Sequence, residues 1–149
     1  MGSYLQIDGQ ETNSKTKSEL LIDAIRLIDN SIMSNFNSTE KERRYFLPEE
    51  YIQIDGVTCG SGSWKIHRKG IARLVEHFDL LLDNPSYIRE LAETEYHKFY
   101  KDGSTDPETR ISKIHQDIEQ TANWCFTYLA NILAVMVIEG KKYVDAEWI

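Results

Sequence analysis

The sequence predicts an all-α protein, a four- to five-helix up-and-down bundle with a small two-stranded β-ribbon. Apolar residues recur at helical spacing in four long segments, and the connections between these segments are short. The chain contains only 3 Pro and 8 Gly in 149 residues, and 41% of its residues are hydrophobic. A chain of this length and composition fits one domain with one core. We therefore interpret residues 1–149 as a single helical-bundle domain.

The segment Trp124–Ile138, WCFTYLANILAVMVI, is apolar on every helical face except at Thr127 and Asn131. It lies within a helical pattern that runs from about Pro107 to Glu139 and ends at Gly140. A helix that is apolar on all sides is expected to be buried on all sides. The apolar run is shorter than the roughly 18 residues that a membrane span requires. We expect a central core helix and no membrane partner.

Residues 1–14 are expected to form a short strand and a flexible lead-in. The hexapeptide Tyr4–Gly9, YLQIDG, alternates in polarity and ends in an Asp-Gly turn signal. Residues Tyr51–Gly56, YIQIDG, repeat it with one substitution. Both copies are predicted to be strands of the ribbon, and a duplicated ligand-binding motif is the alternative interpretation of the repeat.

The first helix is predicted from the capping-box spacing Thr16-Lys17-Ser18-Glu19 and extends to about Asn35. A second box, Thr39–Glu42, predicts a short helical piece that Pro48 limits, because a residue before proline avoids helical geometry.

Three further elements complete the predicted bundle. The glycine-rich stretch 56–63 is followed by Trp64-Lys65, which is expected to lead into a helix with apolar residues from Ile71 to Leu82 on one face. Asn84-Pro85 is a helix start signal, and the helix that follows should end near Lys101. Residues 141–149 are expected to be a tail that folds back on the body or reaches a partner.

The net charge of −7 disfavours broad attraction to nucleic acids or anionic membranes, although it allows a local basic patch. The N-terminus lacks a cationic stretch followed by an apolar run, so we expect no signal peptide and a cytoplasmic location. The two cysteines, Cys59 and Cys125, are too few for a disulfide framework and are expected to be reduced.

Basic residues after the glycine-rich stretch form the first candidate site, for an anion. Free backbone N–H groups at a helix start, with cations beside them, attract anions. The run lacks the G-x-x-x-x-G-K-[ST] pattern of a P-loop, and a solvated basic face is the alternative interpretation. Within this set, Lys65, Lys69 and Arg73 are spaced by four residues and should share a helix face. The candidate residues are Lys65, His67, Arg68, Lys69 and Arg73.

The second candidate site is the pair Arg110 and His115, near the start of the last long helix. Histidine titrates near neutrality, and arginine binds phosphate oxygens through a bidentate fork. On an ideal helix the two side chains point about 140° apart, so they converge only through a distorted first turn or a partner chain. Solvated surface residues are the alternative interpretation.

This pattern resembles HEPN domains, small four- or five-helix bundles that often dimerise and include many metal-independent ribonucleases. Their motif is Arg-x4-6-His near the start of the final core helix. The resemblance implies that Arg110 stabilises the scissile phosphate and that His115 acts as general acid or base. It covers these two residues and the architecture. Ile111 and Gln116 depart from the polar residue and the small residue that many members carry after the Arg and the His.

No metal site and no cofactor are expected. The chain has four histidines, His67, His77, His97 and His115, and Glu93 shares a helix face with His97. It contains no H-x-x-x-H, C-x-x-C or paired E-x-x-H pattern.

The first function predicted is a non-catalytic, self-associating interaction module. A bundle of this length cannot cover a central helix that is apolar on every face, so a homodimer is expected, with a protein or RNA as a further partner. The alternative is a HEPN-like metal-independent ribonuclease or RNA-binding domain. A further alternative is an acidic immunity or antitoxin protein, which the net charge of −7 fits.

Overall fold

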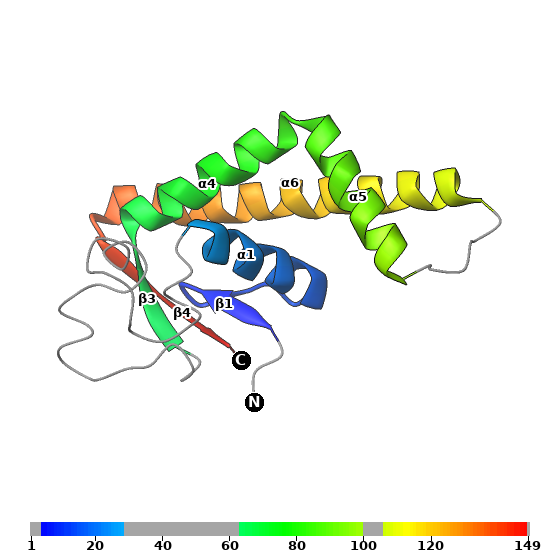
Figure 1. Ribbon diagram of the computed structural model, residues 1–149. Coiled ribbons are helices and arrows are strands. Elements are labelled where there is room, and N and C mark those ends of the chain that lie inside the picture. The colour runs from blue at the N-terminus through cyan, green and yellow to red at the C-terminus, as the bar shows by residue number, and fades with distance from the viewer. Residues whose placement is uncertain (1–3, 29–62, 100–105, 149) are drawn as a thin grey trace.

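The computed structural model describes residues 4–28, 63–99 and 106–148, and these residues are mostly helical, as predicted. Figure 1 shows α6 running along the whole molecule behind α1, α4 and α5, with the strands gathered at one end. The described elements are β1 (Leu5–Ile7), β2 (Gln10–Glu11), α1 (Lys15–Ile28), β3 (Ser63–His67), α4 (Arg68–Leu82), α5 (Pro85–Phe99), α6 (Pro107–Glu139) and β4 (Tyr143–Trp148).

The strands form a four-stranded antiparallel sheet in the order β2-β1-β4-β3, so the predicted two-stranded ribbon is wrong. The expected C-terminal tail folds back as β4, which lies between β1 and β3. Its sequence alternates, with Val144 and Ala146 buried and Asp145 exposed, as suits a strand that covers a core with one face. The second hexapeptide, 51–56, lies outside the described residues.

The first hexapeptide forms β1 and the turn into β2. Asp8 and Gly9 both have positive φ, 55° and 75°, which is the backbone geometry that an Asp-Gly hairpin turn requires. Leu5 and Ile7 point to one side of the strand and are fully buried. The predicted strand and turn are therefore confirmed. In the structure this strand pairs with β2 and β4.

Helix α1 begins at Lys15, and the predicted capping box at Thr16–Glu19 is wrong. The amide of Lys17 donates to the hydroxyl of Ser14 at 3.2 Å, so Ser14 caps the helix. Ser18 is instead buried, where its hydroxyl accepts from the amide of Leu5 at 2.9 Å. The predicted end of this helix near Asn35 and the second box, Thr39–Glu42, lie outside the described residues.

The starts of α5 and α6 and the end of α6 agree with their sequence signals, whereas the predicted end of α5 near Lys101 lies outside the described residues. Asn84 lies one residue before Pro85, the first residue of α5. The side chain of Asn84 accepts a hydrogen bond from the amide of Tyr87 at 3.2 Å. Asp106 caps α6 in the same way, accepting from the amide of Thr109 at 3.3 Å. Gly140, with φ of 68°, ends α6 in the left-handed conformation.

The core lies between one face of α6, helices α1, α4 and α5, and the inner face of the sheet. On α4 the predicted apolar face is confirmed, because Ile71, Leu74 and Phe78 are fully buried. A smaller cluster joins α5 to the first turns of α6 through Ala92, Tyr96 and Ile111.

Helix α6 is not buried on all sides within this chain, so its complete burial requires a second chain and stays a prediction. Val137 and Ile138 expose 60% and 82% of their surface, and Thr127, Asn131 and Ala134 are also exposed. By length and composition alone α6 qualifies as a membrane span, a test that the core helix of a soluble protein also passes. Its inner face packs against α4, α5 and α1.

Candidate functional site

The predicted anion-binding residues lie on two elements instead of one helix face. Lys65 is in β3, and only the residues from Arg68 onward belong to α4, so the expected face of Lys65, Lys69 and Arg73 is wrong. The side chain of Lys65 is 2.9 Å from Asp145 Oδ1. Arg73 is 3.3 Å from Glu76 Oε1. Two of the five candidate side chains therefore form ion pairs within the chain.

His67 caps α4 with its own side chain. Its Nδ1 accepts a hydrogen bond from the amide of Lys69 at 2.9 Å, which occupies one of the N–H groups that an anion would need. Its ring also meets Tyr143 edge to face, with 4.9 Å between the ring centroids. His67 is thus a structural residue of the junction between β3 and α4.

The sheet brings a second basic stretch to this junction. In the register of β3 and β4, His67 lies opposite Tyr143, and the amide of Arg68 donates to the carbonyl of Lys142 at 2.7 Å. We call Arg68, Lys69, Lys141 and Lys142 the basic corner. No signal in the sequence links its two halves, because strand pairing alone makes them neighbours.

Arg110 and His115 occupy the first turns of α6. Arg110 is exposed, and Nε2 of the partly exposed His115 is 3.7 Å from Glu119 Oε2. Helix α6 is continuous from Pro107, so the two side chains point about 140° apart on its surface. A single phosphate group would contact both residues only if a second chain contributed one of them.

Among the described residues, no group of three His, Cys, Asp or Glu side chains lies close enough to hold a metal ion. Glu93, which shares a face with His97, is 3.1 Å from the Nε of Arg89.

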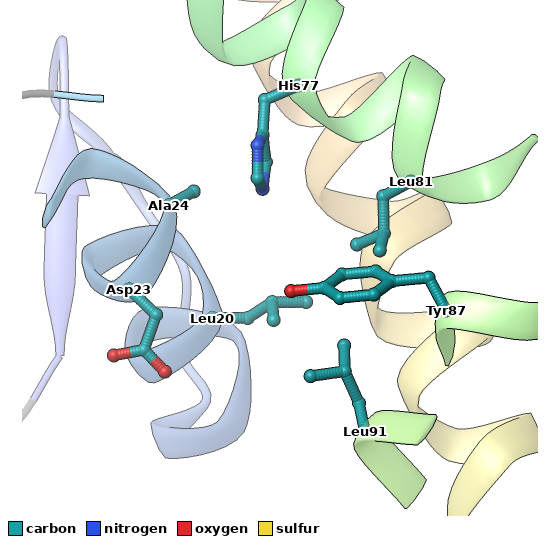
Figure 2. Close-up of a pocket in the computed structure, with 7 residues that line it drawn as sticks. All are labelled: Leu20, Asp23, Ala24, His77, Leu81, Tyr87 and Leu91. Carbon is teal, nitrogen blue, oxygen red and sulfur yellow. The ribbon is translucent and has the colours of Figure 1, made fainter. Parts of the chain in front are cut away.

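A cavity of about 400 Å³ lies between α1, α4 and α5. Figure 2 shows the imidazole of His77 and the ring of Tyr87 directed into it, whereas the carboxylate of Asp23 points away. The sequence did not predict this cavity, because each of three helices contributes only part of its wall. The lining residues are Leu20, Asp23, Ala24, His77, Leu81, Tyr87 and Leu91.

Burial lowers the pKa of His77, and the nearby cation of Arg73 lowers it further. The imidazole is therefore neutral at physiological pH. The cavity presents apolar walls with two hydrogen-bonding groups, this imidazole and the hydroxyl of Tyr87.

The outward face of α6 carries a row of exposed side chains without a charge. These positions recur every three or four residues over six turns, as in helices that pack against a partner helix. The solvated face of an amphipathic helix usually carries charged residues. The apolar composition of the segment does not by itself show which face of the helix the core leaves exposed. We call the row the uncharged stripe: Gln116, Gln120, Asn123, Thr127, Asn131, Ala134 and Ile138.

Comparisons of the chain with protein-family models, curated proteins and solved structures found no match. The function proposed below therefore rests on the geometry of these surfaces.

Proposed function

We propose that the chain is an up-and-down helical bundle and a non-catalytic interaction module, which associates with a second copy of itself through the uncharged stripe. The observation that carries the proposal is the absence of charge at seven exposed positions of one helix face. Charged residues make up 28% of the chain, and such residues concentrate on surfaces. An exposed face without them suits contact with protein better than contact with water.

The side chains of the stripe fit close helix packing. From Gln116 to Ile138 the stripe is about 33 Å long at 1.5 Å per residue. Short side chains at Thr127 and Ala134 let a second helix approach closely. In a two-fold arrangement each helix presents the same stripe to the other, and an Asn131 pair would form a hydrogen bond that fixes the register.

Light scattering on the purified protein at micromolar concentration tests the proposal. We expect a dimer for the wild type and a monomer for Ala134→Glu, because the new carboxylate would be buried at the interface without a partner. Ala72→Glu is the matched control, since Ala72 is an exposed alanine in α4, away from the stripe. A monomeric wild type would refute the proposal, and helical circular dichroism would show that each variant is folded.

The second candidate function is a HEPN-like ribonuclease. Arg110 and His115 lie on opposite sides of Gln116, about 120° and 100° around the helix. Both side chains therefore point away from a chain docked on the stripe, so a site formed by two chains would have to use another face of α6. In such a site Arg110 would hold the phosphate and His115 would transfer a proton.

The nuclease candidate is tested by incubating RNA with the protein in EDTA. Cleavage that is lost in His115→Ala and retained in His97→Ala, another histidine on the surface, would establish a metal-independent nuclease. If the folded, dimeric wild type does not cleave RNA, the ribonuclease is excluded and the non-catalytic module remains as the proposed function.

A further inference from the structure

We propose that the basic corner, together with Val137 and Ile138 at the end of α6, binds the surface of an anionic lipid bilayer. This activity goes beyond self-association. It shares one residue with the proposed dimer interface, Ile138, which is the last position of the uncharged stripe, and its other residues lie outside the stripe. In Figure 1 the start of α4 and the end of α6 lie beside each other at one end of the molecule. That end combines cations and exposed aliphatic side chains.

The cations come from two distant parts of the chain. A hydrogen bond from the amide of Arg68 to the carbonyl of Lys142 holds these two parts together. Within the described parts of the chain, Arg68, Lys69 and Lys142 form no ion pair. Lys141 lies 3.7 Å from Asp8 and 3.6 Å from Glu139, so two carboxylates of the chain share its charge. The corner therefore offers an anionic surface the charges of Arg68, Lys69 and Lys142, with which no described residue forms an ion pair.

The aliphatic side chains lie directly before these lysines. Ile138 and Val137 expose 82% and 60% of their surface, and the left-handed turn at Gly140 leads to Lys141 and Lys142. Exposed aliphatic groups beside cations suit the boundary between lipid headgroups and acyl chains. Nucleic-acid bases stack on aromatic side chains. The rings at this junction, His67 and Tyr143, pack edge to face on each other, and Val137 and Ile138 are aliphatic. This composition favours a bilayer over a nucleic acid.

The net charge of −7 is compatible with such binding. At physiological ionic strength charges are screened beyond about 8 Å, so a bilayer senses mainly the charges of the corner that touches it. The acidic remainder of the surface is repelled by the same bilayer. This difference orients the molecule with its basic corner toward the lipid.

Sedimentation with vesicles tests the cationic part of the proposal. The full chain should bind vesicles of mixed phosphatidylserine and phosphatidylcholine but not vesicles of phosphatidylcholine alone. Each basic residue near an anionic bilayer strengthens binding about fivefold. The variant Lys69→Gln with Lys142→Gln should therefore bind at least about tenfold more weakly. Lys98→Gln with Lys113→Gln removes the same charge elsewhere and should bind within about twofold of the wild type.

The aliphatic part is tested by Val137→Asn, which lies outside the uncharged stripe and should weaken vesicle binding by roughly threefold or more. Leu80→Asn is the matched control, because Leu80 on α4 is equally exposed, at 60%. Failure of the wild type to bind phosphatidylserine vesicles, or equal binding by the double corner variant, would overturn the proposal. Binding of a single-stranded RNA in place of vesicles, lost in that variant, would overturn it in favour of a nucleic acid.

Discussion

The hydroxyl of Tyr128 donates a hydrogen bond to the carbonyl oxygen of Gln10 at 2.6 Å, although 118 residues separate the two in the chain. The same hydroxyl accepts from the amide of Ile7 at 3.1 Å. One side chain of α6 thus holds both strands of the N-terminal hairpin. Burial raises the pKa of Tyr128 to about 12, so the hydroxyl remains a neutral donor at physiological pH.

Tyr128→Phe should lower the free energy of unfolding by about 1–3 kcal/mol, because it leaves a buried amide and a carbonyl without their partner. Urea denaturation followed by circular dichroism measures this loss. Tyr87→Phe removes a hydroxyl that lines the cavity, on a side chain that is 41% exposed, and should cost less than about 0.5 kcal/mol. Equal losses in the two variants would show that the hydroxyl of Tyr128 does not tether the hairpin.

His77 should make the protein less stable in mild acid. Its folded pKa is lowered below 6.5, so the folded state favours the neutral imidazole. The stability that the neutral imidazole of His77 contributes is fully present above pH 6.5, and it is lost as the pH falls through the pKa of the folded state. His77→Gln should reduce the fall in melting temperature between about pH 7.5 and pH 5, whereas substitution of the exposed His97 by Gln should not. Parallel curves for the wild type and His77→Gln would contradict this assignment.

The carboxylate of Glu108 reports on the contact between α5 and α6. Arg89 donates to both of its oxygens, at 2.9 and 2.7 Å, and these hydrogen bonds hold the pKa of Glu108 below its ordinary value. In Arg89→Gln that pKa should rise toward 4.5, as followed by NMR titration of the side-chain carboxyl. Arg73→Gln, which removes a cation from another helix, should leave it unchanged. A constant pKa in Arg89→Gln would mean that the pair is absent in solution.

Cys125 should be chemically inert in the folded protein. It is fully buried, and burial raises the pKa of its thiol to about 12, against the opposing effect of Lys17. At about pH 8 roughly one thiol in 10,000 would be ionised. In a Cys59→Ser variant the remaining thiol should react with an aromatic disulfide reagent only after urea unfolds the chain. Rapid reaction without urea would show that α6 opens readily.

The long helices were predictable because local signals mark their ends. Asn84-Pro85, Asp106-Pro107 and Gly140 act through their own backbone and side chains, without help from distant residues. The sheet was not predictable in the same way. Strand β3 has only five residues, and its pairing with β4 depends on a segment about 80 residues away. Trp64-Lys65 therefore resembled the start of a helix.

The candidate surfaces were likewise predictable only where a local sequence signal marks them. Arg68 and Lys69 could be selected from the sequence, because they follow a glycine-rich stretch. Lys141 and Lys142 could not be joined to them before the register of β4 was known. For α6 the composition indicated burial, but only the packed structure shows which face the core leaves exposed. The cavity around His77 needs three helices at once, so no local pattern predicts it.

The interior position of β4 has a consequence for synthesis on the ribosome. Strand β1 leaves the exit tunnel about 140 residues before β4, and the side chain of Gln6 finally bonds with Glu147, 141 positions later. Until then neither β1 nor β3 has its central neighbour. The nascent chain can form its helices early, but the sheet closes only after translation of β4. A nascent chain stalled before Tyr143 would expose two unpaired strand edges, which are the features that chaperones and proteases detect.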